Sequence, residues 1–472
     1  MNPGLIVILT VLIFWGFNIL VLKAGFVKPQ SIEEYAVANR SLRWVHVSFS
    51  YIGAWYVGAT YTDWFTTAVN FGIFAQYLVL YALGSFVLVY ILARPVWMMG
   101  KKHNLLTLAD FIELRYQSRV FKIFYALFTF AFWVPWIIIE LKTVGYILSV
   151  ATGDLINFDF AVTIVALFII IYCYYGGARA CAVSSLYQVT VFILLGGGLV
   201  YFLIREAYGG LIPLYGLVRA QKPELLGLQG SWNGNLFISS MLTGTIGAMC
   251  WPDEFTHLYR GNSPTAMRRT VILVPFAVIA VAFLPLMLGL GAGLLPGFPA
   301  NTSMGILWIA EHFGGPMGLA LMVVVVLAAC ISSIASIINA ASIVIVNDFR
   351  LAGKELAPDN ALKNAKATTI VVGLLSLWLA TIQLPKLIII EFILYNCIVQ
   401  AAVPLLFGLY WKKGNIIGAV TGMLAGSITV IYGVLYPSAF TWSNGWSTGM
   451  IGLSINCCLY VLFAYLVRRD GY

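Results

Sequence analysis

The stretch VSFSYIGAWYVGATYTDWFTTAVNFG, residues 47–72, is long enough to cross a membrane, yet it does not have the pattern of one uniform apolar helix. Gly53 and Gly58 bracket a polar and aromatic segment, and glycine lowers the stability of a helix interior. We therefore predict that the helix breaks here and that the break frees backbone carbonyls from helical hydrogen bonding.

The composition of the whole chain places this stretch in a membrane. Of its 472 residues, 61% are hydrophobic and only 10% are charged, whereas about a quarter of the residues are charged in an ordinary soluble domain. These values predict an all-α, polytopic membrane protein with about thirteen spans of roughly 20 apolar residues each. We expect the spans at residues 4–24, 45–71, 73–98, 122–152, 159–175, 181–204, 233–252, 270–295, 316–347, 367–384, 387–411, 415–436 and 448–467.

A second interrupted span follows five spans after the first. The segment MLTGTIGAMCWPDEF, residues 241–255, contains Gly244, Gly247 and Pro252. Close helix packing by glycine would explain either span alone. Two interrupted spans at matching positions instead favour an inverted-repeat transporter with its binding site near the middle of the membrane.

The basic residues predict the orientation of the chain. No Lys or Arg precedes the first span, and Lys23 follows it, so we read it as a retained helix with the N-terminus outside. With that start, about 22 of the 27 Lys and Arg residues lie at cytoplasmic ends. The basic residues behind the net charge of +9 are thus explained by the orientation of the chain in the membrane, and the charge does not indicate nucleic-acid binding. We expect a plasma membrane location, the inner membrane in a bacterium, with a cytoplasmic C-terminus.

Enzyme and metal-cluster functions find no support in the sequence. The seven cysteines contain no C-x-x-C pair and lie in or beside predicted spans, which indicates neither a disulfide framework nor a zinc site. No catalytic constellation is present, so we do not expect an enzyme or a cofactor other than an ion.

Polar residues within the span LAACISSIASIINAASIVIVNDF, residues 327–349, predict an ion site. On a helix, the hydroxyls of Ser332 and Ser333 diverge by about 100°, with the Ala329 carbonyl one turn before them. Two hydroxyls and a carbonyl can thus converge beside the helix, as an all-oxygen site for a small monovalent cation requires. Hydroxyl bonding back to the helix backbone, or close helix contact, is the alternative.

At this point the chain resembles the sodium:solute symporters, the family of the sodium/proline, sodium/glucose, sodium/sialic acid and sodium/pantothenate carriers. Five segments in order are similar to family motifs: EEYAVANRSLRWVHVSFS (33–50), LLTLADFIELRY (105–116), YYGGARACAVSSLYQ (174–188), ACISSIASIINAASIVIVNDF (329–349) and LYWKKGNIIGAVTGMLAGSI (409–428).

The resemblance implies ten core helices in two inverted five-helix repeats, the LeuT-like fold of amino acid transporters. We expect one transporter domain over residues 1–472, divided into an extra N-terminal helix (4–24), repeats at 45–204 and 233–411, and C-terminal helices at 415–467. It also implies a sodium ion bound by two carbonyls at the first break and by three groups of the eighth core helix: Gly53, Tyr56, Ala329, Ser332 and Ser333.

Departures from the family pattern concern the number of sodium ions. Where some members carry an acidic residue in the first core helix, this chain has Trp55. Where the fifth core helix of relatives has its W-T-D motif, this chain has Val183, Ser184 and Ser185, and Ala335 replaces a serine that helps to form a second site. These departures favour one sodium per cycle and leave sodium and proton coupling both open.

The solute is predicted from charged residues in the span FAFWVPWIIIELKTVGYILSV, residues 130–150. Glu140 and Lys142 are two positions apart and do not face each other on a helix. Lys142 could form a buried pair with Glu391. Alternatively, it could bind the carboxylate of a small organic anion or zwitterion, such as a monocarboxylate or amino acid. The expected solute-site residues are Trp55, Thr60, Gln76, Glu140, Lys142, Trp251, Asn396 and Gln400.

The sequence supports symport of a small-molecule solute most strongly, with the lipid bilayer as its surroundings. Transporter-like domains of this family also serve as input modules of sensor kinases, so a sensor working with a separate signalling partner protein is an alternative. A passive channel is less favoured, because broken helices imply an occluded site.

Overall fold

The computed structural model describes residues 2–228, 230–349, 358–382, 387–411 and 413–467. Within these residues the regular elements are helices, and an isolated β-bridge pairs Leu42 with Gly261. The all-α prediction is confirmed.

Helices are present at all the predicted spans, some of them in two pieces. Their bounds, in chain order, are α1 (Pro3–Ala24), α3 (Trp44–Trp55) with α4 (Ala59–Phe71), α5 (Tyr77–His103), α7 (Arg119–Trp133) with α8 (Pro135–Thr152), α9 (Phe158–Thr190), α10 (Gly197–Tyr208), α12 (Gly234–Gly247) with α13 (Pro252–Arg260), α15 (Thr270–Ala277) with α16 (Leu284–Ala292), α17 (Gly305–Asp348), α18 (Pro358–Thr381), α19 (Leu387–Ile398) with α20 (Ala402–Tyr410), α21 (Ile416–Leu435) and α22 (Thr448–Leu466). Shorter helices connect them: α2 (Ile32–Val37), α6 (Leu108–Tyr116), α11 (Leu211–Gln221) and α14 (Pro264–Arg268).

Ten helical runs in the described residues are long and apolar enough to cross a membrane by themselves. Three of the thirteen predicted spans are not separate in that count. The second is joined to the third within residues 59–103, and the sixth is joined to the fifth within residues 158–208. The seventh is broken into α12 and α13, so neither piece reaches spanning length.

The turn between the fifth and sixth spans lies inside α9 and depends on one glycine. Gly177 has φ 53° and ψ −144°, a conformation that side chains with a Cβ rarely adopt. A Cβ there would also lie 2.7 Å from the Tyr35 carbonyl oxygen. Within α9 only Gly177 departs from helical backbone angles, and the chain turns from the fifth span to the sixth at this residue.

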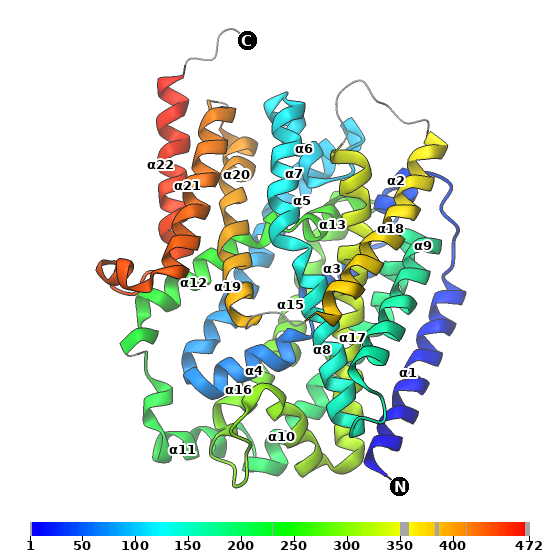
Figure 1. Cartoon of the computed structure of the whole chain (residues 1–472), viewed down its shortest axis with the longest axis vertical. Coiled ribbons are helices and arrows are strands. Elements are labelled where there is room, and N and C mark those ends of the chain that lie inside the picture. Colours follow the sequence, from blue (N-terminus) through cyan, green and yellow to red (C-terminus); the bar gives the residue numbers. More distant parts are fainter. Residues whose placement is uncertain (1, 229, 350–357, 383–386, 412, 468–472) are drawn as a thin grey trace.

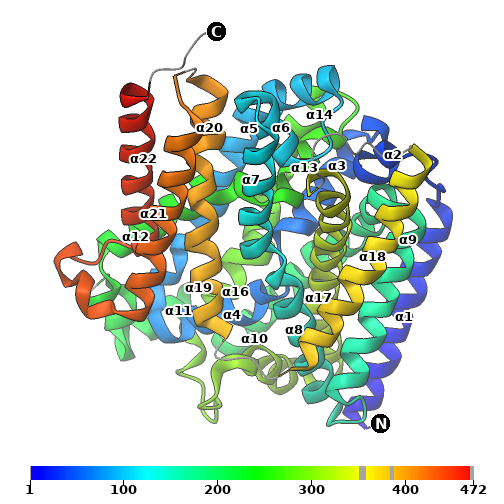
Figure 2. The same cartoon turned by 45° about the horizontal axis from the view of Figure 1, so that its top comes forward.

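The two ends of the described chain lie at opposite ends of the molecule. In Figure 1, α1 begins at the bottom and α22 ends near the top, while α11 and α6 also lie at opposite ends. The tilted view in Figure 2 keeps this separation. An odd number of crossings produces this arrangement, in agreement with thirteen spans.

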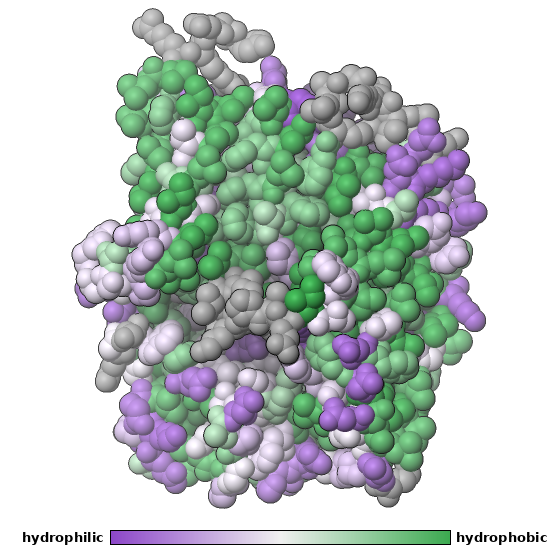
Figure 3. Space-filling view, viewed as in Figure 1, coloured by the Kyte–Doolittle hydropathy of each residue, from purple (hydrophilic) through white to green (hydrophobic). Residues whose placement is uncertain are grey.

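The outer surface carries apolar side chains of the kind that face lipid. Figure 3 shows green, hydrophobic residues gathered over the C-terminal helices and α18, with hydrophilic residues at the lower end. On α1, large side chains such as Leu12, Ile13 and Leu20 are 54–60% exposed. Only 22% of the apolar window of α1 is buried inside the protein.

Helix α17 is the buried centre of the molecule. It packs against α9, α1, α8, α18 and α3, and 94% of its apolar window is buried. Its serines therefore face other helices rather than lipid. This explains why a membrane-spanning segment carries so many hydroxyl groups.

Candidate functional site

The first predicted break is present at residues 56–58. Helix α3 ends at Trp55, Tyr56 is extended with φ −92° and ψ 101°, and α4 begins at Ala59. The carbonyls in the last turn of α3 therefore lack the amides that a continuous helix would offer. The break lies beside α17, which packs against both α3 and α4.

Ser332 of α17 reaches across to this break. Its Oγ donates to the carbonyl oxygen of Gly53 at 2.7 Å and to that of Ala329 at 2.9 Å. Gly53 permits the approach, because a Cβ there would lie 3.2 Å from the Ser332 Cβ and 2.9 Å from a methyl group of Val189. The Ser332 hydroxyl thus lies within hydrogen-bond distance of two of the other four oxygen groups predicted for sodium.

Ser333 connects the same region to Glu140 on α8. Its Oγ donates to the Cys330 carbonyl at 3.0 Å and to Glu140 Oε2 at 3.4 Å. Glu140 is fully buried, and its carboxylate accepts from the backbone N–H of Gly58 at 2.8 Å and of Ala59 at 3.4 Å. Glu140 therefore caps the first turn of α4, where a negative charge is favourable.

The sequence did not predict this role for Glu140, which was expected in the solute site. Capping of α4 is a contact between residues about 80 positions apart, so spacing along one helix cannot find it. The sequence does show a glutamate within a membrane span. A buried carboxylate needs hydrogen-bond donors or a cation, so such contacts could have been expected for Glu140.

The chemistry of this region fits a small monovalent cation. Ser332 and Ser333 are buried, with exposures of 1% and 0%, and the oxygens around them come from backbone carbonyls and from the Glu140 carboxylate. Oxygen ligands in a water-poor site are what such a cation requires. Within the described residues no cluster of three His, Cys, Asp or Glu side chains suits a transition metal.

The second predicted break is also present. Helix α12 ends at Gly247, a short 3-10 turn covers Ala248–Cys250, and α13 begins at Pro252. Trp251 between them is extended, with φ −76° and ψ 117°. The backbone at this break turns the Trp251 side chain into a cavity together with the first residues of α13.

This cavity lies between the two broken spans and has a volume of about 80 Å³. One water needs about 10–15 Å³ on the same measure, so the space suits roughly five to eight non-hydrogen atoms. It is lined by seven aromatic, three acidic and four aliphatic side chains: Trp55, Trp64, Tyr81, Trp133, Trp136, Trp251, Tyr395, Asp63, Asp253, Glu254, Ala54, Val57, Ala59 and Ile337.

Of the residues expected in the solute site, the structure brings Trp55 and Trp251 together in this cavity. Lys142 lies elsewhere: its Nζ donates to the carbonyl of Ile382 at 2.6 Å and lies 5.9 Å from the Phe158 ring centre. The side chain of Glu391, its expected rival partner, is outside the described residues.

The remaining expected residues line other parts of the protein. The Gln76 amide lies 3.9 Å from the Met287 sulfur, and the buried Thr60 hydroxyl is near the start of α4 without a hydrogen-bond partner. Asn396 donates to the Phe392 carbonyl at 2.8 Å. Gln400 donates to the Gly449 carbonyl at 3.2 Å, which attaches its part of the chain to α22.

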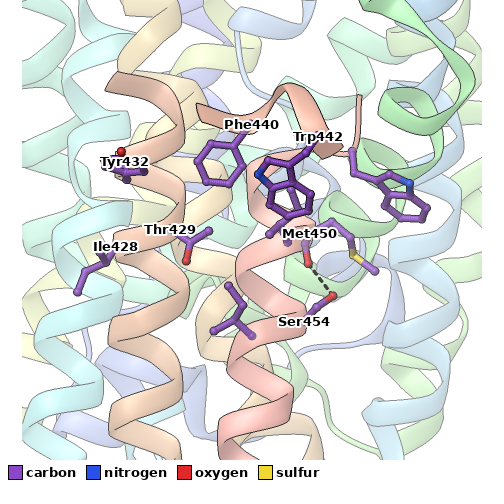
Figure 4. Close-up of a pocket in the computed structure, with 10 residues that line it drawn as sticks. Ile428, Thr429, Tyr432, Phe440, Trp442, Met450 and Ser454 are labelled. Atoms are coloured by element: carbon purple, nitrogen blue, oxygen red, sulfur yellow. Dashed lines mark hydrogen bonds between the residues drawn. The ribbon is translucent and has the colours of Figure 1, made fainter. Parts of the chain in front are cut away.

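A larger groove, of about 670 Å³, lies at the edge of the molecule. Figure 4 shows its walls, which come from α21, α22 and the turn before α22 and include Phe440, Trp442 and Met450. Among the described residues, no charged side chain lines it. Its apolar walls lie on the C-terminal helices whose outer faces carry lipid-type side chains, far in the chain from either broken span.

Comparisons with known proteins agree with this geometry. An uncharacterized symporter of Bacillus subtilis, YhjB, is 25% identical over 99% of this chain and 98% of its own length. The sodium/pantothenate symporter of Escherichia coli is 26% identical over 75% of this chain and 76% of its own.

Solved structures share the fold. A Na⁺-coupled sialic acid symporter superposes with a TM-score of 0.81, at 18% identity, over 98% of this chain and 99% of that one. Mhp1, a nucleobase-cation-symport-1 family transporter, superposes with a TM-score of 0.54, at 14% identity, over 92% of this chain and 95% of that one.

The model of the sodium:solute symporter family matches residues 35–426. This match covers both broken spans, the buried serines of α17 and every wall of the aromatic cavity. The family is one of transporters and not of enzymes. The chain belongs to the sodium:solute symporter family.

Proposed function

We propose that the protein couples the inward movement of sodium to uptake of a small organic solute by alternating access. The observation that supports this most directly is the distance of 2.7 Å between the Ser332 hydroxyl and the Gly53 carbonyl oxygen. This contact joins the buried helix α17 to α3 just before its break. In the proposed site, sodium is bound by the carbonyls of Gly53, Tyr56 and Ala329 and the hydroxyls of Ser332 and Ser333.

The neighbouring groups support one sodium per cycle. Ser184 donates to the Asn18 amide oxygen at 2.9 Å, so it is turned toward α1. The Ala335 carbonyl accepts from the thiols of Cys173 and Cys181 at 3.7 and 3.6 Å. Where some relatives have a second site, this chain offers thiols and the Ser185 hydroxyl in place of a carboxylate, which suits a second hard cation poorly.

The solute is proposed to bind in the aromatic cavity between the two breaks. Of the two solute classes expected from the sequence, the cavity favours a zwitterion over an organic anion. Three carboxylates line it, and the Lys142 ammonium is hydrogen-bonded to the Ile382 carbonyl instead. A simple anion would be repelled by the buried acids Asp253 and Glu254, and among the described residues neither of them forms an ion pair.

The proposed arrangement places the N-terminus outside and the C-terminus in the cytoplasm of a plasma membrane, the inner membrane in a bacterium. Residues 45–204 and 233–411 form the two inverted repeats, and each contributes one broken span. The relatives named above are symporters, which gives no support to a sensor that needs a signalling partner.

The test is a measurement of solute-evoked current on proteoliposomes containing the full chain. Glycine betaine, choline, proline, pantothenate and pyruvate are applied in sodium, and then in potassium at the same pH. A symporter gives a current with at least one solute in sodium and none in potassium. Equal currents in potassium that follow an imposed pH gradient would show proton coupling and overturn the proposal.

A further inference from the structure

We propose that the transported solute carries a quaternary ammonium group, held by the aromatic walls and acidic rim of the cavity between the two broken spans. This inference rests on the proposed function and names the class of solute for the same cavity.

Half of the side chains that line the cavity are aromatic. Three of them form one wall: Trp251 and Tyr395 have ring centres 5.3 Å apart at 62°, and Trp136 lies 5.9 Å from Trp251 at 79° and 6.2 Å from Tyr395 at 80°. Rings at such steep angles to one another cannot all point their edges in the same direction. The rings thus form one rigid aromatic wall with faces in more than one direction, the kind of surface on which proteins bind methylated ammonium groups.

A second aromatic group completes the lining on the side of α3 and α4. Tyr81 packs against Trp55 at 6.0 Å and against Trp64 at 5.9 Å. The Tyr395 hydroxyl donates to the Tyr81 hydroxyl at 2.9 Å, which joins the two aromatic groups. Since the two hydroxyls are hydrogen-bonded to each other, the Tyr81 and Tyr395 rings contribute apolar ring surface to the cavity more than polar groups.

Two carboxylates lie beside these rings at the start of α13. Asp253 and Glu254 line the cavity, and each is only 3% exposed. The Oε2 atom of Glu254 is buried and has no hydrogen-bond partner. A buried carboxylate without a partner is costly, so a cationic ligand at this position would be strongly favoured.

The nearby basic group does not neutralise this pair of acids. Arg260 attracts both carboxylates electrostatically, but its guanidinium donates to His257 Nε2 at 2.7 Å and to Asn339 Oδ1 at 3.5 Å. In the part of the chain that the structure describes, neither carboxylate has a basic side chain within 4.0 Å. One guanidinium is thus shared electrostatically by two buried acids, and the Glu254 Oε2 atom stays available to a cationic ligand.

The rest of the lining favours a quaternary over a primary ammonium. A primary ammonium carries three N–H groups, each of which needs an acceptor once it is removed from water. The acids can accept only part of this set, because Asp253 and Glu254 lie together at the start of α13. The other described non-aromatic lining residues are Ala54, Val57, Ala59 and Ile337, whose side chains accept no hydrogen bonds. Methyl groups on nitrogen pack well against such apolar side chains and against ring faces.

The indole groups provide for the other end of the solute. The Nε1 atoms of Trp55, Trp133 and Trp136 are buried and lack hydrogen-bond partners. These N–H groups can donate to an oxygen, so a quaternary ammonium with a hydroxyl or carboxylate tail suits the cavity. Both choline and glycine betaine have this form and fit its limited volume.

The decisive experiment compares two ligands that differ in one atom. Binding to the purified full-length protein in saturating sodium is measured by calorimetry for choline and for 3,3-dimethylbutan-1-ol, in which carbon replaces the charged nitrogen. Glycine betaine and pyruvate are measured in parallel. We expect choline or glycine betaine to bind at least about 10-fold more tightly than the neutral alcohol, because only a cation gains from the ring faces and carboxylates. Equal binding of choline and the alcohol, or tighter binding of pyruvate, would overturn the inference.

Variants locate the effect in the cavity. Glu254→Gln keeps the size of the side chain and should weaken binding of the preferred ammonium ligand by about 10-fold or more. Glu311→Gln, at an exposed glutamate of α17, is the matched control and should leave binding unchanged. Trp136→Leu should weaken binding more than Trp136→Phe, which retains a ring face. Identical binding by Glu254→Gln and Glu311→Gln would contradict the inference even if the parent binds choline.

Sodium binding separates this inference from the proposed function. If sodium raises the melting temperature and drives uptake of proline or pyruvate but no quaternary ammonium binds, the function stands and the solute class is wrong. If choline binds with equal affinity in sodium and potassium, the solute class stands and sodium coupling is wrong.

Discussion

The Ser332 hydroxyl donates to the carbonyl oxygen of Gly53 at 2.7 Å, although 279 residues separate them in the chain. This bond joins the most buried helix, α17, to the last turn of α3 before its break. A cation bound between the same oxygens would hold the two helices together more strongly than the hydrogen bond alone. Its arrival and departure would therefore change the position of α3 relative to α17, and the proposed solute cavity begins at the next residue, Ala54.

Glu140 is expected to raise the sodium affinity of this region. Its carboxylate accepts from Gly58 N–H at 2.8 Å and from Ser333 Oγ at 3.4 Å, so it can orient a sodium-binding hydroxyl and adds a negative charge nearby. Glu140→Gln keeps an acceptor for the Gly58 amide but removes the charge. Sodium affinity, measured by titration of the melting temperature, should fall by about 10- to 100-fold.

The control is Glu140→Ala, which removes the acceptor as well. It leaves the amides of Gly58 and Ala59 without their cap, so the free energy of unfolding should fall by about 1–3 kcal/mol in the absence of sodium. A Gln variant that binds sodium as tightly as the parent would show that the carboxylate acts only as a cap.

Lys142 is expected to stabilise the protein without contacting the solute. Its Nζ donates to the Ile382 carbonyl at 2.6 Å, which connects α8 to the end of α18. Lys142→Met should lower the free energy of unfolding by about 1–3 kcal/mol, because the carbonyl loses a charged donor. Binding of the preferred solute should stay within about twofold of the parent. A large loss of solute affinity at unchanged stability would instead support the direct contact that the sequence suggested.

An ionic cluster joins α6, α7 and the end of α17. Lys122 forms ion pairs with Asp110, with Glu113 at 2.9 Å and with Asp348 at 3.4 Å. Burial opposes ionisation of Asp110, but the Lys122 charge and hydrogen bonds from Lys122, the Leu106 amide and other donors hold its pKa below the ordinary value.

This lowered pKa predicts how stability depends on pH. The ionised Asp110 contributes fully above about pH 4, the ordinary value for aspartate, and its contribution is lost as the pH falls through the lowered pKa. Asp110→Asn should therefore be less stable than the parent at pH 7, by about 1–3 kcal/mol, and the difference should shrink on acidification. Thermal unfolding at pH 7 and near pH 3 measures it. A difference that is the same at both pH values would show that Asp110 acts without its charge.

Labelling of single engineered cysteines tests the orientation of the chain in the membrane. Asn104, which follows α5, and Gln221, the last residue of α11, are both exposed and belong to opposite ends of the molecule. In a background with the exposed Cys458 replaced by Ser, a cysteine at position 221 should react with a membrane-impermeant maleimide on intact cells. A cysteine at position 104 should react only after the membrane is opened. The reverse pattern would invert the proposed topology.

The two breaks could be predicted from the sequence because their causes are local. Glycine and proline act on the helix in which they lie, so Gly53, Gly58 and Pro252 indicated interruptions wherever those helices pack. The proposed ion ligands Ser332 and Ser333 could be named for a similar reason, since they are adjacent on one helix. The interruption itself falls at residues 56–58, slightly after the midpoint that the two glycines suggest.

The cavity proposed as the solute site was harder to predict because its described walls come from six segments of the chain. Sequence spacing cannot show that Asp253 and Glu254 turn toward Trp55, about 200 residues away. The signal was nonetheless present, since the two acids directly follow Trp251 and Pro252 at the second break. Lys142 was predicted to contact the solute because it is a charge within a span. A long side chain can instead donate to a backbone carbonyl of a neighbouring segment, as this one does to Ile382.

The most direct test of sodium coupling at α17 is a sodium titration of the melting temperature, in potassium-balanced buffer, on the parent and on Ser332→Ala/Ser333→Ala. Alanine keeps helix propensity, so folding in potassium should change little, while two of about five proposed ligands are lost. We predict a saturable rise in melting temperature with sodium for the parent and an affinity at least about 10-fold weaker for the double variant. An identical sodium response in both proteins would contradict the account, because it would place the cation at some other site.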